Sequence, residues 1–282
     1  MCAHCNFDFI SVWYKKLIKT KMNITENKKL APVFFLGHGN PMNALYDNAF
    51  TKHLKEMGNS LETKPDAILV VSAHWLTKGS FTGITSKPET IYDFYGFPEE
   101  LYKIVYPAPG APEYAKHLSD LYPFIKRDEE MGLDHGAWTM LVHMFPEAGI
   151  PVFQLSIDIH KPLQYHYELG KKLHYLREQN VLIIGSGNIV HNLRYAFPLD
   201  NPVKFEWAYE FDEWVKEKII KKDFESLIDY ESCGSAGKMS VPTTDHYIPL
   251  LYVLGLAGKN EDIKFTYEEI ITSLSMRCLK IG

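Results

Sequence analysis

Unbroken apolar runs, and not alternating ones, mark the main strands that the sequence predicts. The clearest is 66–75, where "DAILVVSAHW" has the continuous apolar character of a strand buried on both faces of a sheet. Similar runs at 31–41, 149–158 and 180–192 lead into polar or glycine-rich residues. We predict further strands at 80–86, 263–270 and 273–281.

Helical spacing of apolar residues separates these runs. We predict helices over the following ranges: 47–61, 111–122, 161–179, 204–221, 223–230 and 245–258. Two segments read as loops, 89–112 with one helical turn and 231–244 with many small residues. The alternation predicts an α/β fold: a single domain with a central mixed or mainly parallel sheet, flanked by helices.

The N-terminal segment stands apart from this pattern. Met22 precedes a polar lead-in to the first strand, so we expect residues 1–21 to be an extension and residues 22–282 to be the main domain. Its charges follow a short apolar run, which is not the order of a signal peptide. The "CAHC" at its start lacks the second pair of ligands that a zinc site usually has.

Composition removes several classes of partner. A net charge of −5 and a pI near 6.2 argue against nucleic acid as a main partner. The longest apolar run, 248–257, is too short for a bilayer, which needs about 20 residues. Four cysteines do not make a disulfide framework, so a cytoplasmic location is expected. The sequence does not determine the oligomeric state, and a homo-oligomer is one of the states that it allows.

Histidines stand at the ends of three predicted strands. His38, His74 and His191 each follow an apolar run, and ligands of open α/β sheets bind at the carboxyl ends of strands. His246 begins a predicted helix, with Thr or Asp before it as a cap, and His135 lies in a glycine-flanked turn, "LDHGAW". One such histidine is usually structural. Several that converge suit a zinc or iron ion, because neutral imidazole is a common ligand of both.

Other chemistries find weak support. The chain has no Gly-x-Ser-x-Gly elbow, no Walker loop and no His-Glu-x-x-His. In "GSGNIV", Val190 replaces the third small residue of a dinucleotide fingerprint.

Eight blocks together resemble the DODA-type extradiol aromatic ring-opening dioxygenases, relatives of the β-subunit of protocatechuate 4,5-dioxygenase. They are "GHGNPMNAL", "VVSAHW", "YDFYGFPEELY", "YPAPG", "LDHGAWTML", "PVFQLSI", "GSGNIVHNL" and "PTTDHYIPLLYVLG". They occur in family order from about Pro32 to the C-terminus. Asn40 departs from the family, where many members have serine.

The resemblance assigns a role to each histidine. It implies that His38, His74 and His246 bind the metal, that His191 faces its open side, and that His135 lies near the substrate. Three ligands leave Fe(II) positions for a catechol and O2. Fe(II) is therefore the expected metal of the active form. Zinc, which prefers four ligands, can occupy the site in isolated protein with His191 as the fourth.

The implied reaction is that of an oxidoreductase that incorporates both atoms of O2. A mononuclear non-heme site opens a catechol-type, DOPA-like ring beside the diol, and His191 takes a phenolic proton. His135 would hydrogen-bond the substrate or oxygen. Four aromatic residues could line the ring or simply pack their own loop: Tyr92, Phe94, Tyr95 and Phe97.

Two alternatives use the same residues. A zinc-dependent hydrolase would use zinc-bound water as its nucleophile. A non-catalytic binding protein similar to the Memo proteins would share the fold, although those tend to have cysteine at the third ligand position. His246 at that position favours the enzyme. The sequence does not indicate which catechol is cleaved.

Overall fold

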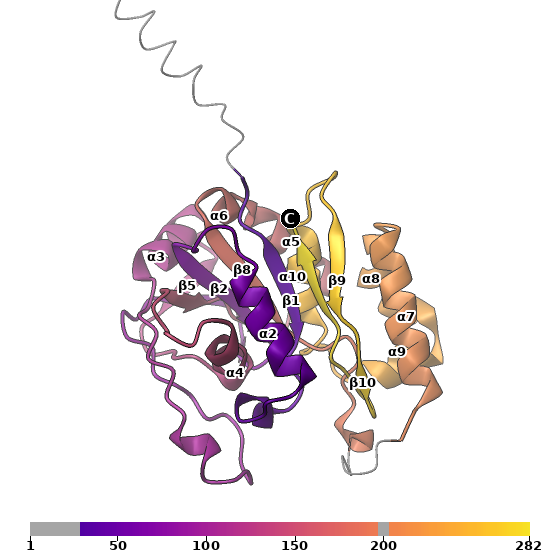
Figure 1. Ribbon diagram of the computed structural model, residues 1–282. Coiled ribbons are helices and arrows are strands. Elements are labelled where there is room, and N and C mark those ends of the chain that lie inside the picture. Colours follow the sequence, from indigo (N-terminus) through magenta and orange to yellow (C-terminus); the bar gives the residue numbers. More distant parts are fainter. Residues whose placement is uncertain (1–28, 197–202) are drawn as a thin grey trace, which may run out of the picture. The chain divides into compact units, whose positions relative to one another are not determined.

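The centre of the molecule is a six-stranded sheet with strand order β6-β2-β8-β1-β12-β9 (Figure 1). The computed structural model describes residues 29–196 and 203–282, so the predicted extension 1–21 and its "CAHC" lie outside the described residues. The strands are β1 (Val33–Gly37), β2 (Ala67–Ser72), β6 (Val152–Gln154), β8 (Val181–Gly187), β9 (Ile263–Tyr267) and β12 (Cys278–Ile281).

Strand direction agrees with the sequence prediction of a mixed, mainly parallel sheet. β1 pairs in parallel with β8, and β2 pairs in parallel with both β8 and β6. β12 is antiparallel to β1 and to β9. The carboxyl ends of β1, β2 and β8 therefore meet at one edge of the sheet.

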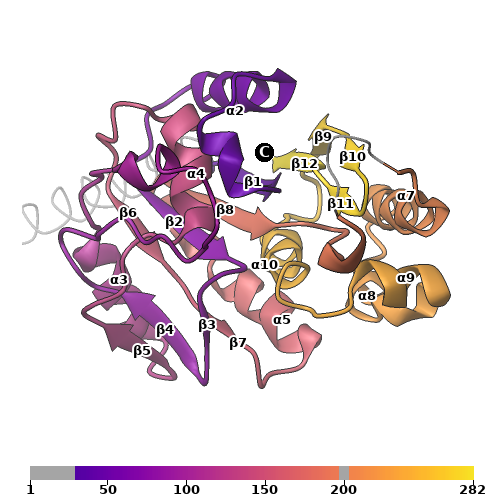
Figure 2. The same cartoon turned by 90° about the horizontal axis from the view of Figure 1, so that it is seen from below.

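Each face of the sheet buries alternate residues of the same strands. Val33 and Phe35 join one apolar cluster, and Phe34 and Leu36 join the other. All residues of β1, β2 and β8 are buried, because helices cover both faces (Figure 2). The unbroken apolar runs in the sequence have this physical cause.

Helices α2 (Ala49–Asn59) and α4 (His135–Met144) pack on one face of the sheet. Helices α5 (Leu163–Lys172) and α10 (Ile248–Gly255) pack together on the other. The remaining α-helices are α3 (Pro112–Leu121), α6 (His174–Glu178), α7 (Glu206–Ile220), α8 (Phe224–Ile228) and α9 (Ser235–Ser240). Short 3₁₀ turns are η1 (Pro41–Ala44), η2 (Leu101–Lys103), η3 (Leu193–Tyr195) and η4 (Tyr230–Cys233).

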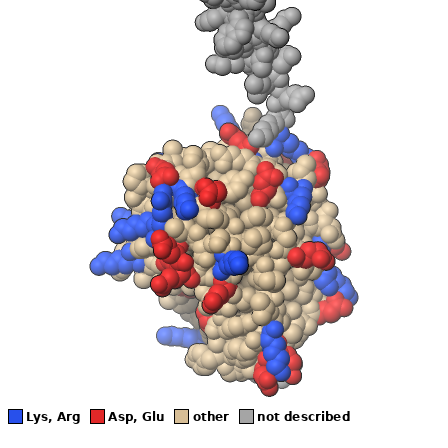
Figure 3. Space-filling view, turned by 90° about the vertical axis from the view of Figure 1, so that its left-hand side faces the viewer, with Lys and Arg blue, Asp and Glu red and all other residues tan. Residues whose placement is uncertain are grey.

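Three small two-stranded sheets complete the fold. They pair β3 (Leu76–Thr77) with β7 (Ile157–Asp158), β4 (Ser80–Gly83) with β5 (Ile125–Asp128), and β10 (Ile270–Ile271) with β11 (Leu274–Ser275). Acidic and basic side chains are interspersed on the face shown in Figure 3. Among the described residues, none of the helices has the length and apolar character that crossing a membrane would require.

Three local predictions were wrong. His135 does not lie in a turn but begins α4, because the Asp134 side chain caps that helix by accepting from the Ala137 N–H. The predicted loop 231–244 contains α9. The predicted helix 161–179 is two helices, because the chain tightens at Leu173, whose N–H reaches both the Leu169 and the Gly170 carbonyls.

Candidate metal and active site

Five histidines from five separate segments lie together at the carboxyl edge of the sheet. His38, His74 and His191 follow β1, β2 and β8, while His135 begins α4 and His246 precedes α10. Between neighbouring rings the centroid distances range from 3.4 Å, for His191 and His246, to 5.8 Å, for His38 and His135. All five residues singled out in the sequence are thus brought together.

Ser186 fixes the orientation of the His38 ring. The Ser186 hydroxyl donates to the Gly136 carbonyl at 2.6 Å, and its oxygen lies 3.0 Å from His38 Nδ1. Because the hydroxyl hydrogen is already used, this contact requires the His38 proton on Nδ1, which donates to Ser186. His38 Nε2 is then left with a free lone pair, as in metal-binding histidines whose other nitrogen donates to a neighbour.

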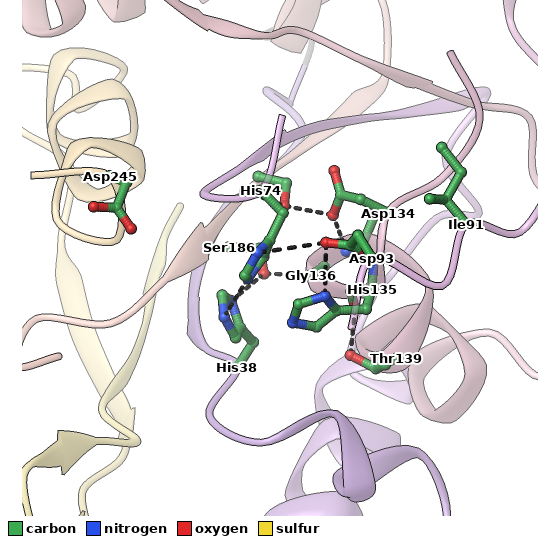
Figure 4. Close-up of polar contacts among 12 residues, drawn as sticks. His38, His74, Ile91, Asp93, Asp134, His135, Gly136, Thr139, Ser186 and Asp245 are labelled. Atoms are coloured by element: carbon green, nitrogen blue, oxygen red, sulfur yellow. Dashed lines mark hydrogen bonds and ion pairs between the residues drawn. The ribbon is translucent and has the colours of Figure 1, made fainter. Parts of the chain in front are cut away.

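The Nε2 atoms of His38 and His74 are 3.1 Å apart. On the other side of the His74 ring, Nδ1 lies 3.5 Å from the Asp93 carboxylate, whose charge favours a proton on that nitrogen. Two Nε2 lone pairs then face the same point. Nitrogen ligands about 2.1 Å from one ion are about 3 Å apart, so this pair fits a shared metal ion. Figure 4 shows the two rings edge to edge.

His135 is held against the same carboxylate. Asp93 Oδ1 accepts from the His135 backbone N–H at 2.8 Å, and Oδ2 accepts from ring Nδ1 at 2.8 Å. Burial tends to raise the pKa of Asp93, but the hydrogen bonds and charge of His135 outweigh it, so the pKa lies below its usual value. Asp93 was not among the residues predicted from the sequence, where its only signal is its place in the block "YDFYGFPEELY".

The remaining two histidines stack on each other. The rings of His191 and His246 are 3.4 Å apart at an angle of 5°, and Asp245 accepts a hydrogen bond from His246 Nδ1. The predicted helix cap does not form there, since Asp245 contacts the imidazole and α10 begins two residues after His246, at Ile248. The backbone N–H of His191 donates to the Ser240 carbonyl at 2.9 Å.

The candidate ligand atoms fall into two adjacent groups. Those of His38, His74 and His135 lie within 4.8 Å of one another, and those of His191, Asp245 and His246 form the second group. The ring centroid of His246 is 5.2 Å from the ring centroid of His38 and 5.0 Å from that of His74. The predicted ligand set of His38, His74 and His246 therefore draws on both groups.

Burial keeps the rings of His38, His74, His191 and His246 neutral. It lowers the pKa of His74 to about 3 and that of His191 to about 4, and neighbouring histidines add to the effect. Burial also places the pKa values of His38 and His246 well below the usual 6.5. Neutral imidazole is the form that binds metal. His191 is a weaker base than its ordinary pKa had led us to expect.

A buried carboxylate behind the histidines connects three elements. Asp134 accepts hydrogen bonds from Ser72 on β2 at 2.6 Å and from Gln154 on β6 at 2.7 Å. Burial raises its pKa, against the effect of these hydrogen bonds. Gly136 is needed here, because a Cβ would lie 2.5 Å from the Ser72 hydroxyl and 2.9 Å from the His74 ring. The strand ends and α4 are thereby fixed at a close separation.

The aromatic loop has divided roles. Phe94 lies edge-on to His135, with ring centroids 5.5 Å apart, so it borders the site. Tyr92 instead packs on Trp138 and donates to the Ile104 carbonyl at 2.7 Å. Tyr95 is 92% exposed. Of the aromatic residues named from the sequence, Phe94 is the one next to a site histidine.

An α/β sheet with a histidine cluster at its carboxyl edge is an arrangement suited to binding a metal ion, and similarity to known proteins identifies the family. Residues 31–276 match the family of the catalytic LigB subunit of aromatic ring-opening dioxygenase. The chain belongs to this family and is an extradiol ring-opening dioxygenase.

Relatives of known name extend over most of the chain. A 4,5-DOPA dioxygenase extradiol of Escherichia coli (strain K12) is 44% identical over 260 residues, 89% of this chain and 94% of that protein. One from Beta vulgaris is 40% identical over 234 residues, 80% of this chain and 87% of that protein. The crystal structure of an uncharacterized protein from Escherichia coli K12 matches with a TM-score of 0.77 and 40% identity, and covers 89% of this chain and 100% of that one.

Proposed function

We propose that this enzyme opens the ring of a DOPA-like catechol with O2 at a mononuclear non-heme metal. One observation supports the metal most directly: His38 and His74 face each other with Nε2 atoms 3.1 Å apart, while Ser186 and Asp93 occupy their other nitrogens. The names of the relatives support the substrate class.

We assign the metal to His38, His74 and His246, with His191 beside it. In His246, as in His38, Nδ1 is occupied, here by Asp245, so Nε2 is the nitrogen that can bind a metal. The stacked His191 can serve as a fourth ligand for zinc or swing free when only three are needed. Fe(II) is the proposed metal of the active form, and it would supply a site at which catechol and O2 bind side by side and exchange electrons.

The protein residues around that site have separate tasks. His191 is neutral and takes a proton from a substrate hydroxyl as the diol binds. His135 has its Nδ1 proton engaged by Asp93, so its Nε2 can only accept, and we assign it to a hydrogen bond from a substrate hydroxyl. Phe94 covers the aromatic ring of the substrate from the His135 side.

The experiment that tests this function compares metals in one preparation. Protein stripped of metal is reloaded without oxygen, with Fe(II) or with zinc, and O2 uptake and the yellow ring-opened product are followed after addition of DOPA or simpler catechols. The iron form should consume O2, and the zinc form should not, because zinc has no accessible redox change. Equal uptake by both forms would refute the mechanism. Ester hydrolysis by the zinc form, with no uptake by either, would favour a hydrolase.

A further inference from the structure

We infer that Asp93 is a positioning residue that sets two histidines at once, the metal ligand His74 and the substrate-facing His135. This inference rests on the proposed function for the roles of those two histidines. It starts from a shared atom: Asp93 Oδ2 lies 2.8 Å from His135 Nδ1 and 3.5 Å from His74 Nδ1. Figure 4 shows the carboxylate between the two rings.

The arrangement determines which nitrogen of each ring faces the site. A carboxylate can only accept hydrogen bonds, so His135 must carry its proton on Nδ1, and the negative charge favours the same choice in His74. Both rings then present an Nε2 lone pair inward. The two ring centroids are 3.8 Å apart, which keeps these lone pairs in the same small volume. One carboxylate thereby links metal binding to substrate binding.

The carboxylate is not needed to hold its own loop. Tyr92 donates to the Ile104 carbonyl, Trp138 Nε1 donates to the Ile91 carbonyl at 2.9 Å, and the Ile91 N–H donates to the Leu133 carbonyl at 2.8 Å. These three bonds fix the backbone on the N-terminal side of Asp93 without its side chain. Asp93 is also only partly exposed, with 25% of its side-chain surface accessible. Its carboxylate therefore serves the histidines more than the loop.

The test compares Asp93→Asn with Tyr92→Phe, a matched variant that removes a loop hydrogen bond and leaves both histidine contacts in place. In Asp93→Asn the amide oxygen can still accept the His135 backbone N–H. The amide NH2 then faces His135 Nδ1 and forces the ring proton onto Nε2. Zinc-loaded protein with ¹⁵N-labelled histidine reports this directly, because long-range ¹H–¹⁵N spectra show which nitrogen is protonated.

We expect the His135 proton on Nδ1 in the natural chain and on Nε2 in Asp93→Asn. Zinc affinity, measured by chelator competition, should fall about 10- to 100-fold, the usual cost of losing a partner behind a metal ligand. Catechol turnover by the iron form should fall by a similar factor. Tyr92→Phe should stay within about twofold on all readouts. In a His135→Ala background, Asp93→Asn should still weaken zinc binding through His74, but at saturating iron it should no longer slow turnover.

The inference is wrong if His135 carries its proton on Nε2 in the natural chain, or if Asp93→Asn and Tyr92→Phe behave alike. The spectrum of the natural chain decides even if Asp93→Asn does not fold. Failure of the proposed function looks different: the iron form would cleave no catechol, while the proton positions and zinc affinities would still follow Asp93.

Discussion

Two of the buried polar clusters in the described part of the chain are built on opposite principles. In the first, Arg277 is 2% exposed and bonds to Asp212, Glu213 and Glu268, while Ser275 donates to the free oxygen of Asp212 at 2.6 Å. In that cluster the positive charge of the guanidinium is compensated by the carboxylates around it. In the second, five histidines meet, and burial, with a smaller effect of the neighbouring histidines, places the pKa values of His38 and His246 well below their usual value. The first cluster is complete within the chain, whereas the second is open and suited to an external cation.

The largest expected effect is loss of metal from the histidine cluster. Replacing any one of His38, His74 and His246 by Ala should weaken metal binding more than about 10- to 100-fold. That range is the usual effect of removing a residue that hydrogen-bonds a metal ligand, and removing the ligand itself should cost more. Turnover should vanish with the metal. Metal content after dialysis gives the answer, and full occupancy in two of the three variants would show that the ligand set is wrong. His135→Ala is the matched control, and it should retain metal.

His191→Ala should separate chemistry from metal binding. The iron form should still bind iron with three ligands, while catechol cleavage slows about 10²- to 10⁴-fold, the usual contribution of a general base. Steady-state O2 uptake together with iron analysis measures both. Near-normal turnover in this variant would show that His191 is not the general base.

Arg277→Met should break the complete cluster and leave the open one intact. Without the guanidinium, Asp212 stays buried and unpaired, so the free energy of unfolding should fall by about 3–5 kcal/mol. Urea unfolding measures this loss, and zinc affinity of the folded variant should not change. The double variant Arg277→Met with Asp212→Leu should recover much of the stability. If the single variant is as stable as the natural chain, the cluster contributes little to the fold.

The smallest effect concerns pH in metal-free protein. The folded-state pKa values of His74 and His191 lie at about 3 and about 4, below the unfolded value near 6.5. Between those limits the unfolded chain binds protons that the folded chain does not, so stability falls as pH decreases. Each such histidine lowers the free energy of unfolding by about 1.4 kcal/mol for each pH unit of acidification in this range. Urea unfolding at pH 7, 6 and 5 gives the free energy of unfolding as a function of pH. This dependence should be weaker in His74→Ala than in the natural chain, and an equal dependence would contradict this account.

The sequence predicted the parts of the site that depend on chain pattern. His38, His74 and His191 were predictable because each ends an apolar run, and parallel strands bring such ends together. Asp93 was not, because nothing in an aromatic loop shows that a carboxylate will turn toward a helix start about 40 residues later. The ring stacking of His191 on His246 depends likewise on tertiary packing.

The fold shows the same limit. The large strands and most helices were predicted from apolar spacing, but β5 was missed because "IKRD" is short, charged and half exposed. Within the predicted helix 161–179, His166 is fully buried against Tyr252. Its burial follows from α10, whose residues are all buried and which packs along α5. The residue pattern of one helix does not show which other helix will pack against it.

The position of β12 has a consequence for shortened forms of the protein. Residues Cys278–Ile281 pair with β1 and separate it from β9. Without them one edge of the apolar β1 has no partner, and such an edge can pair with other chains. A chain cut before Cys278 would therefore keep all five site histidines and yet expose an aggregation-prone edge of the sheet.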